Sequence, residues 1–130
     1  MALSEGGFGP LVREYRVRVG LSQNQLARRA GIDPAYVNRL ERSGPDGGVP
    51  RRRVVLSLAA ALELGPVDRE RLLIAAGLCP ESIARLGGWD PTLGLVAGVL
   101  ADPRLGADDR ADFRELLRIV AARWSPAPDE

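Results

Sequence analysis

The sequence contains no histidine and no lysine, and its 130 residues include a single cysteine, Cys79. Without histidine, the chain lacks the side chain most often used as a general acid or base and as a metal ligand. One cysteine allows no disulfide within the chain and no cysteine-based zinc site. No glycine-rich segment is followed by the Lys-Ser/Thr pair of a phosphate-binding loop. We therefore expect no enzymatic activity, no metal and no other cofactor.

Aromatic residues and long apolar runs are also scarce. Only 5% of the residues are aromatic, whereas 45% are hydrophobic, which predicts a core built from leucine, valine, isoleucine and alanine. No apolar run approaches the roughly 20 residues needed to span a membrane. The N-terminus lacks the basic and apolar regions of a signal peptide. We expect a cytoplasmic protein with no membrane partner.

Charge is distributed unevenly along the chain, although the net charge is only +1. Residues 1–78 carry twelve arginines against eight acidic residues, a net of +4, and residues 79–130 carry six against nine, a net of −3. A basic half is what a protein that approaches phosphates requires. The N-terminal half is therefore the place to look for an anionic partner.

One stretch, residues 21–42, has the signals of two short helices around a tight turn. Ser22 is a good N-cap, and Gln25 completes a capping box three residues later. Gly31 can end the first helix in the left-handed conformation. Asp33 then caps a second helix, and Pro34 fits its first position. The apolar residues expected to lock the two helices together are Leu26, Ala27, Ile32, Val37 and Leu40.

This pattern resembles the helix-turn-helix of the Cro/repressor-type transcriptional regulators, the XRE family. The matching residues are Gln23, Leu26, Ala27, Gly31, Val37, Leu40, Glu41 and Arg42. The structural alternative is an ordinary helical hairpin with a glycine turn. The resemblance implies an all-α fold, a compact five-helix bundle that binds DNA, followed here by a small helical C-terminal region.

Outside the helix-turn-helix, helical periodicity and breaker residues place the remaining elements. We expect helices over 10–19, 51–63 and 67–76, with a loop at 43–48. Further helices are expected over 80–86, 91–101 and 107–124. These give a DNA-binding domain over 10–78, a C-terminal region over 79–124, and flexible ends at 1–9 and 125–130.

In the family's architecture, the helix over 34–42 enters the major groove with its N-terminal half toward the bases. Val37 and Leu40 face the core, so Ala35, Asn38 and Arg39 should project toward DNA. Asparagine can bond adenine, and arginine guanine, through two hydrogen bonds each. The alternative is that these side chains are merely solvated. Predicted contacts to the DNA backbone come from Ser22, Gln23, Tyr36, Arg42, Arg51, Arg52 and Arg53.

The resemblance also implies one structural contact. Arg16 and Glu41 occupy positions that form a largely buried ion pair between the first and third helices in members of this family. Removing one partner should unfold the domain rather than alter sequence preference, because the other charge would be left buried and unpaired.

The segment over 107–124 has the clearest amphipathic pattern in the chain. Its apolar stripe consists of Phe113, Leu116, Leu117, Val120 and Trp124. We interpret this stripe as a homodimerisation surface; the alternative is that it packs on the chain's own bundle. The sequence thus predicts a dimeric, sequence-specific regulator of double-stranded DNA, acting as a repressor. The competing hypothesis is an adaptor or antitoxin that holds a partner protein through residues 80–124.

Overall fold

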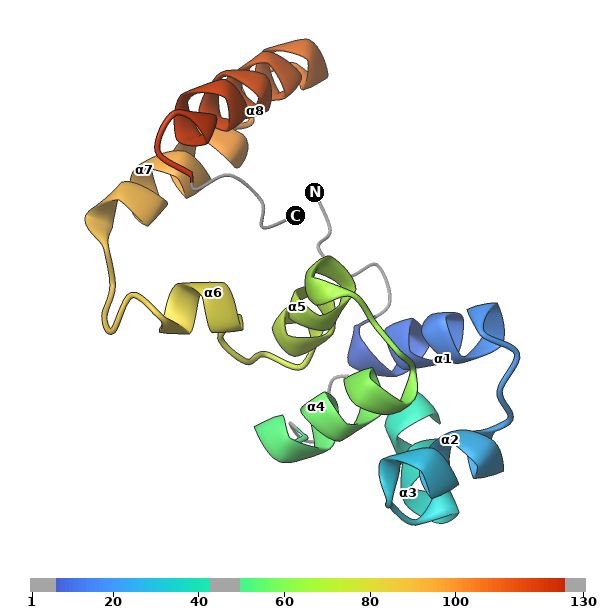
Figure 1. Ribbon diagram of the computed structural model, residues 1–130. Helices are drawn as coiled ribbons and strands as arrows, with labels where there is room; N and C mark the ends of the chain where they lie inside the picture. Colours follow the sequence, from blue (N-terminus) through green and yellow to red (C-terminus); the bar gives the residue numbers. More distant parts are fainter. Residues whose placement is uncertain (1–6, 43–49, 126–130) are drawn as a thin grey trace. The chain divides into compact units, whose positions relative to one another are not determined.

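The structure is a computed structural model that describes residues 7–42 and 50–125, and within these ranges all regular secondary structure is helical (Figure 1). The all-α prediction is confirmed. The expected loop at 43–48 lies outside the described residues. The helices are α1 (Phe8–Arg18), α2 (Gln23–Ala30), α3 (Pro34–Arg42), α4 (Arg52–Ala61), α5 (Pro66–Ala75), α6 (Glu81–Ala84), α7 (Pro91–Leu100) and α8 (Ala107–Ala122).

The chain divides into two compact units, Met1–Gly87 and Gly88–Glu130. Polar contacts attach α6 to the first unit. The backbone N–H of Ser82 donates to Glu70 Oε1 at 2.9 Å, and Arg69 Nη2 lies 3.4 Å from Glu81 Oε2. The hydrogen bonds from Ser82 also hold the pKa of Glu70 below its usual value. The predicted boundary at residue 78 lies within the first unit.

The turn between α2 and α3 has the local geometry that the sequence signals indicate. Ser22 Oγ accepts the backbone N–H of Gln25 at 3.0 Å, and Gln25 Oε1 accepts the backbone N–H of Ser22 at 2.8 Å. Gly31 has a φ of 72°, which a side chain would make costly. Asp33 Oδ1 accepts the backbone N–H of Ala35 at 2.7 Å, so it caps the start of α3.

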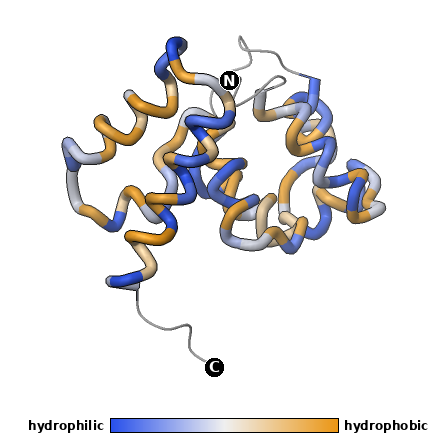
Figure 2. The backbone as a smooth tube through the Cα atoms, turned by 90° about the horizontal axis from the view of Figure 1, so that it is seen from above, coloured by the Kyte–Doolittle hydropathy of each residue, from blue (hydrophilic) through white to orange (hydrophobic). Residues whose placement is uncertain are grey.

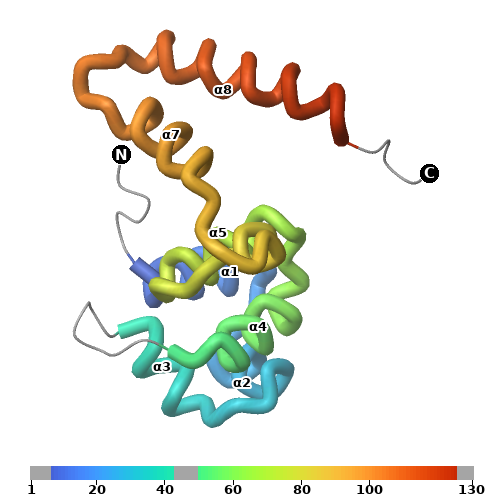
Figure 3. The backbone as a smooth tube through the Cα atoms, turned by 90° about the vertical axis from the view of Figure 1, so that its left-hand side faces the viewer, coloured from blue at the N-terminus to red at the C-terminus, as the bar shows by residue number. Residues whose placement is uncertain are grey.

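The first unit has a complete hydrophobic core. Close helix packing joins α2 to α3 and α4, α1 to α3 and α5, and α4 to α5 (Figure 3). Ala27 is fully buried, and so is Val37, which keeps the inner face of the α2–α3 pair apolar. The buried apolar residues are Val12, Tyr15, Leu21, Leu26, Ala27, Val37, Leu40, Val55, Leu58, Ala59, Ala61, Leu62, Leu72, Leu73 and Ala76.

The first helix differs from its prediction at both ends. It begins at Phe8, within the stretch expected to be a flexible arm, and it ends at Arg18. Gly9 is buried because the start of α1 lies against the end of α3. A Cβ atom at residue 9 would lie 2.4 Å from the carbonyl oxygen of Leu40 and 2.8 Å from that of Glu41. Val19, which has the helical spacing of a core residue, is 45% exposed because the helix has already ended.

A polar contact closes the bundle between α1 and α5. The Tyr15 hydroxyl donates to Asp68 Oδ1 at 3.2 Å, and Arg18 Nη2 lies 3.1 Å from Asp68 Oδ2. Arg71 also pairs with this carboxylate, at 3.6 Å. Burial, and then the negative charge of Asp68, raise the pKa of Tyr15 above its ordinary value of 10.0.

The second unit has helices but no buried core. None of the described residues 88–125 is buried, although hydrophobic residues recur in α7 and α8 as they do in the bundle (Figure 2). Arg110 Nε donates to the carbonyl of Leu100 at 2.9 Å, and its Nη2 donates to that of Asp102 at 2.7 Å. These bonds fix the turn, from which the two helices leave in diverging directions (Figure 3). Within the described ranges, α7 and α8 are not among the closely packed helix pairs.

Replacing Gly9 with alanine should destabilise the first unit by about 1–3 kcal/mol, the usual cost of overpacking. A loss of stability would be diagnostic, because alanine in a helix is otherwise more stable than glycine by roughly 1 kcal/mol. Urea unfolding followed by circular dichroism measures the change. Gly88→Ala is the control, since nothing lies within 4 Å of the added methyl group. Equal or greater stability of the Gly9→Ala variant would contradict the close approach of α1 and α3.

Stability should also fall at alkaline pH through Tyr15. Because its pKa is raised on folding, the neutral phenol contributes stability that is intact below about pH 10. This contribution is lost as the pH rises through the folded-state pKa. Melting temperatures across pH 8–12 should show the loss in the wild type and a weaker one in Tyr15→Phe. Tyr36→Phe leaves the contact with Asp68 in place and should behave as the wild type; an equal loss in all three proteins would exclude this origin.

Candidate nucleic-acid interface

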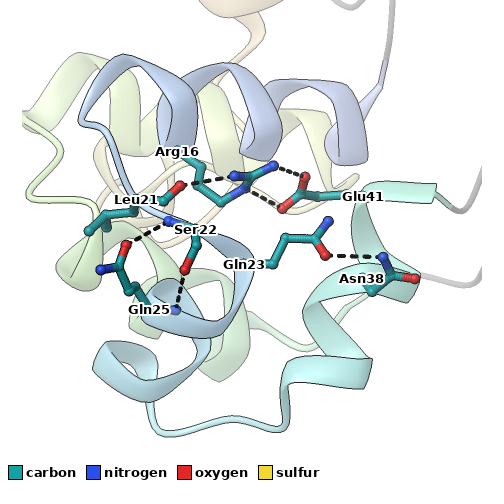
Figure 4. Close-up of polar contacts among 7 residues, drawn as sticks. All are labelled: Arg16, Leu21, Ser22, Gln23, Gln25, Asn38 and Glu41. Carbon is teal, nitrogen blue, oxygen red and sulfur yellow. Dashed lines mark hydrogen bonds and ion pairs between the residues drawn. The ribbon is translucent and has the colours of Figure 1, made fainter.

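The orientation of α3 is fixed by one arginine that bonds three parts of the bundle. Arg16 Nε donates to Glu41 Oε2 at 2.8 Å, and its Nη2 donates to Glu41 Oε1 at 2.9 Å (Figure 4). Its Nη1 donates to the carbonyl of Leu21 at 2.9 Å. The side chain of Glu41 is only 3% exposed and that of Arg16 14%. The ion pair joins α1 to the end of α3, the two helices that the resemblance names, and the third bond adds the turn before α2.

A second contact between helices orients the outward side of α3. Asn38 Nδ2 donates to Gln23 Oε1 at 3.1 Å (Figure 4). The bond uses one of the two amide hydrogens of Asn38 and leaves the other, together with its carbonyl oxygen, for a ligand. Adenine presents one acceptor and one donor in the major groove, which match these two remaining groups. The first residue of α2 therefore positions the amide that the sequence predicts to read a base.

The other predicted base-contacting residues lie on α3 beside Asn38. Ala35 and Arg39 are exposed, whereas Val37 and Leu40 on the opposite side are buried. The guanidinium carbon of Arg39 lies 5.6 Å from the centre of the Tyr36 ring, close enough for a cation–π contact. This contact restricts the side chain without using its hydrogen-bond donors.

The predicted backbone-contacting residues fall into two groups. Ser22, which is exposed, caps α2, and the half-buried Gln23 is its first residue; Tyr36 and Arg42 belong to α3. The other three are Arg51, Arg52 and Arg53 at the start of α4.

One of the three arginines at the start of α4 differs from the other two in exposure and in hydrogen bonding. Arg51 and Arg53 are exposed. Arg52 is half-buried, and its Nη2 donates to the carbonyl of Cys79 at 2.6 Å. Arg52 therefore connects the start of α4 to the segment after α5, and any phosphate contact would have to share its guanidinium.

Two contacts at this surface were not anticipated from the sequence. The stacking of Arg39 on Tyr36 has a sequence signal, because residues three apart on a helix are neighbours. The bond from Arg16 to the carbonyl of Leu21 has no such signal, because every residue carries the same carbonyl group.

The side chains at this surface offer amide and guanidinium groups for binding. Among the described residues, no cluster of acidic and cysteine side chains suits a metal ion. No helix in the described ranges is both long and apolar enough to cross a membrane.

Two helices joined by a glycine turn, the second with outward amide and guanidinium groups, define a helix-turn-helix protein. The family described as "Helix-turn-helix domain" matches residues 8–72, half of the chain. The chain therefore belongs to this family and is a DNA-binding transcription regulator. The predicted helix-turn-helix resemblance is confirmed.

One solved structure is similar to part of the chain. It is the restriction-modification controller protein C.AhdI from Aeromonas hydrophila, with 37% sequence identity and a TM-score of 0.42. The match covers 48% of this chain and 89% of the controller protein. No curated protein matches the chain.

Replacing Glu41 with alanine should cost about 3–5 kcal/mol of stability, the usual effect of leaving one member of a buried ion pair without its partner. Guanidinium unfolding measures the loss. Glu14→Ala removes an exposed acidic side chain from α1 and serves as the control. The double variant Arg16→Ala/Glu41→Ala should cost less than the sum of its two single variants, because the second substitution removes the orphaned charge. An unchanged melting temperature for Glu41→Ala would refute this role for the ion pair.

Proposed function

We propose that the protein is a sequence-specific regulator of double-stranded DNA that reads the major groove with α3. The observation that carries this proposal is the bond from Asn38 to Gln23, which presents a pre-oriented amide beside an exposed arginine, Arg39. A structural amide would have both ends satisfied within the protein, whereas this one retains a free donor and acceptor pair. Repression as the direction of control rests only on the resemblance to Cro/repressor-type regulators.

The basic groups around α3 have a separate task in this proposal. Contacts from Arg42, Arg51 and Arg53 to phosphates would fix the register of α3 without carrying sequence information. All three side chains are exposed. Affinity supplied in this way falls as the salt concentration rises, because binding releases counterions from the DNA.

A dimer would extend recognition beyond the few base pairs that one α3 can contact. Two copies related by a two-fold axis would read an inverted repeat with half-sites about one helical turn apart. The exposed apolar side chains of α8 support this proposal, including Leu116, which is 60% exposed, and Trp124, just after the helix, which is 72% exposed.

The second candidate is a protein-binding adaptor or antitoxin, and the same apolar side chains favour it. In that case α7 and α8 would hold a partner protein of different sequence. An adaptor has no need for the Asn38 and Arg39 arrangement on α3, so DNA selection separates the two candidates. In both cases the proposed role is binding rather than catalysis.

The decisive experiment selects bound duplexes from a random DNA pool with the wild type and with Asn38→Ala/Arg39→Ala. We expect the wild type to enrich an inverted repeat. The variant should lose this preference, because each two-bond base contact supplies about 1–3 kcal/mol of discrimination, a factor of roughly 5 to 150. Circular dichroism checks that the variant remains folded.

Arg53→Ala is the matched comparison for this experiment. Removing one phosphate contact from each copy should weaken binding to all sequences alike and reduce the steepness of log affinity against log salt by about 2 for the dimer. Enrichment of the same repeat by the wild type and the double variant would refute base reading by Asn38 and Arg39. Salt-sensitive binding without any enrichment would favour the adaptor.

A further inference from the structure

The second unit has more apolar surface than its own residues can cover. Helix α7 has no charged residue, and Leu95 on it is 73% exposed. A helix that is apolar on all sides is normally buried. With ten residues, α7 is far too short to span a membrane. The exposed apolar residues of α7 and α8 therefore need a protein surface against them.

Two charged residues of opposite sign lie on the same flank of the apolar stripe on α8. Phe113, Leu116, Leu117 and Val120 lie on one side of the helix, and Trp124 continues the stripe just beyond its end. Asp112 precedes Phe113 by one residue and Arg123 precedes Trp124 by one residue. One step along a helix always turns in the same direction, so both charges lie on the same flank of the stripe.

These charges are free to meet a partner. By contrast, Glu115 and Arg118 near the middle of the helix form an ion pair with each other within the chain. Among the described residues, neither Asp112 nor Arg123 forms an ion pair, and the Arg123 side chain lies over the ring of Trp124, at 5.5 Å. The flank thus carries an unpaired negative charge at Asp112, beside the first residue of the stripe, and an unpaired positive charge at Arg123, beside its last.

We infer that the occupant of this face is a second copy of the chain, with the two α8 helices antiparallel. In an antiparallel pair, the same flank of each helix faces its counterpart. Asp112 of each copy then lies beside Arg123 of the other, about a midpoint between residues 117 and 118. The inference deepens the dimer of the proposed function and rests on it.

The antiparallel arrangement also covers the apolar stripe with the stripe of the second copy. With Asp112 opposite Arg123 of the second copy, Phe113 approaches Trp124 of that copy, and Leu117 lies next to the two-fold axis. A parallel copy would place Asp112 near Arg114, but it would place Ala121 and Ser125 beside Arg123, with no acidic residue in reach. Only the antiparallel arrangement pairs both charges. The two-fold axis then produces two Asp112–Arg123 ion pairs in each dimer.

Cysteine cross-linking of the full chain tests the orientation directly. In a Cys79→Ser background, Leu117→Cys should form an intermolecular disulfide on mild oxidation, because residue 117 lies near the axis. Phe113→Cys is the matched control on the same stripe. The two copies of residue 113 would be offset by nine residues, about 13 Å along the axis, beyond the roughly 7 Å between Cα atoms that a disulfide tolerates. Circular dichroism checks that both variants remain folded.

Charge reversal with analytical ultracentrifugation tests the pairing. Asp112→Arg and Arg123→Asp should each raise the dimer Kd by about 3- to 30-fold, as expected for the loss of two exposed ion pairs. The double reversal Asp112→Arg/Arg123→Asp should restore the wild-type Kd. Arg118→Asp, a reversal away from the stripe, should leave it within about twofold, since exposed pairs within a helix contribute little.

Cross-linking at 117 without cross-linking at 113, together with rescue in the double reversal, supports the antiparallel dimer. Cross-linking at both positions indicates parallel helices and overturns it. A monomer at all concentrations, a dimer without cross-links, or a stable complex only with a different protein also overturns it. These results are independent of the DNA selection: an enriched repeat without cross-linking refutes this inference alone, and cross-linking without enrichment refutes sequence-specific reading alone.

Discussion

The bidentate pair between Arg16 and Glu41 is the contact on which the orientation of α3 depends. It closes the polar end of α3 against α1, and through the carbonyl of Leu21 it also holds the entry to α2. A fork of fixed donors is needed to bond a carboxylate and a main-chain carbonyl together, and lysine could not provide it. With α3 held in this way, the amide of Asn38 meets Gln23 and the outward side of α3 has a defined shape.

Arginine has two roles in this chain, which contains no lysine. Arg16, Arg52 and Arg110 bond main-chain carbonyls and thereby connect helix ends with neighbouring segments. Arg39 and Arg53 are exposed and have their donors available for bases or phosphates in the proposed complex. A count of basic residues therefore overstates the charge that is free to bind DNA, and the run at 51–53 illustrates this because its middle member is engaged by Cys79.

The two units have different relations between sequence and stability. The first unit buries a contiguous set of apolar side chains, so its fold is complete within one chain. The second unit forms helices from good local signals, such as the Asp90 cap of α7, but buries none of its described residues. Its exposed apolar side chains are the surface that the proposed self-association would cover. DNA reading and self-association would then be assigned to separate parts of the chain.

The sequence by itself determined the local structure: the capping box at Ser22, the glycine turn at Gly31 and the helical spacing of the core are all short-range signals. Each predicted helix is present, although the bounds of several, α1 above all, differ from the prediction. The same signals identified α3 and its outward residues. Tertiary structure alone decided what depends on contacts between distant segments. Gly9 lies against the carbonyls at the end of α3, which leave room only for glycine, and Arg52 bonds a partner 27 residues away. Periodicity records which side of a helix is apolar, but it does not record which main-chain atoms another helix will bring against it.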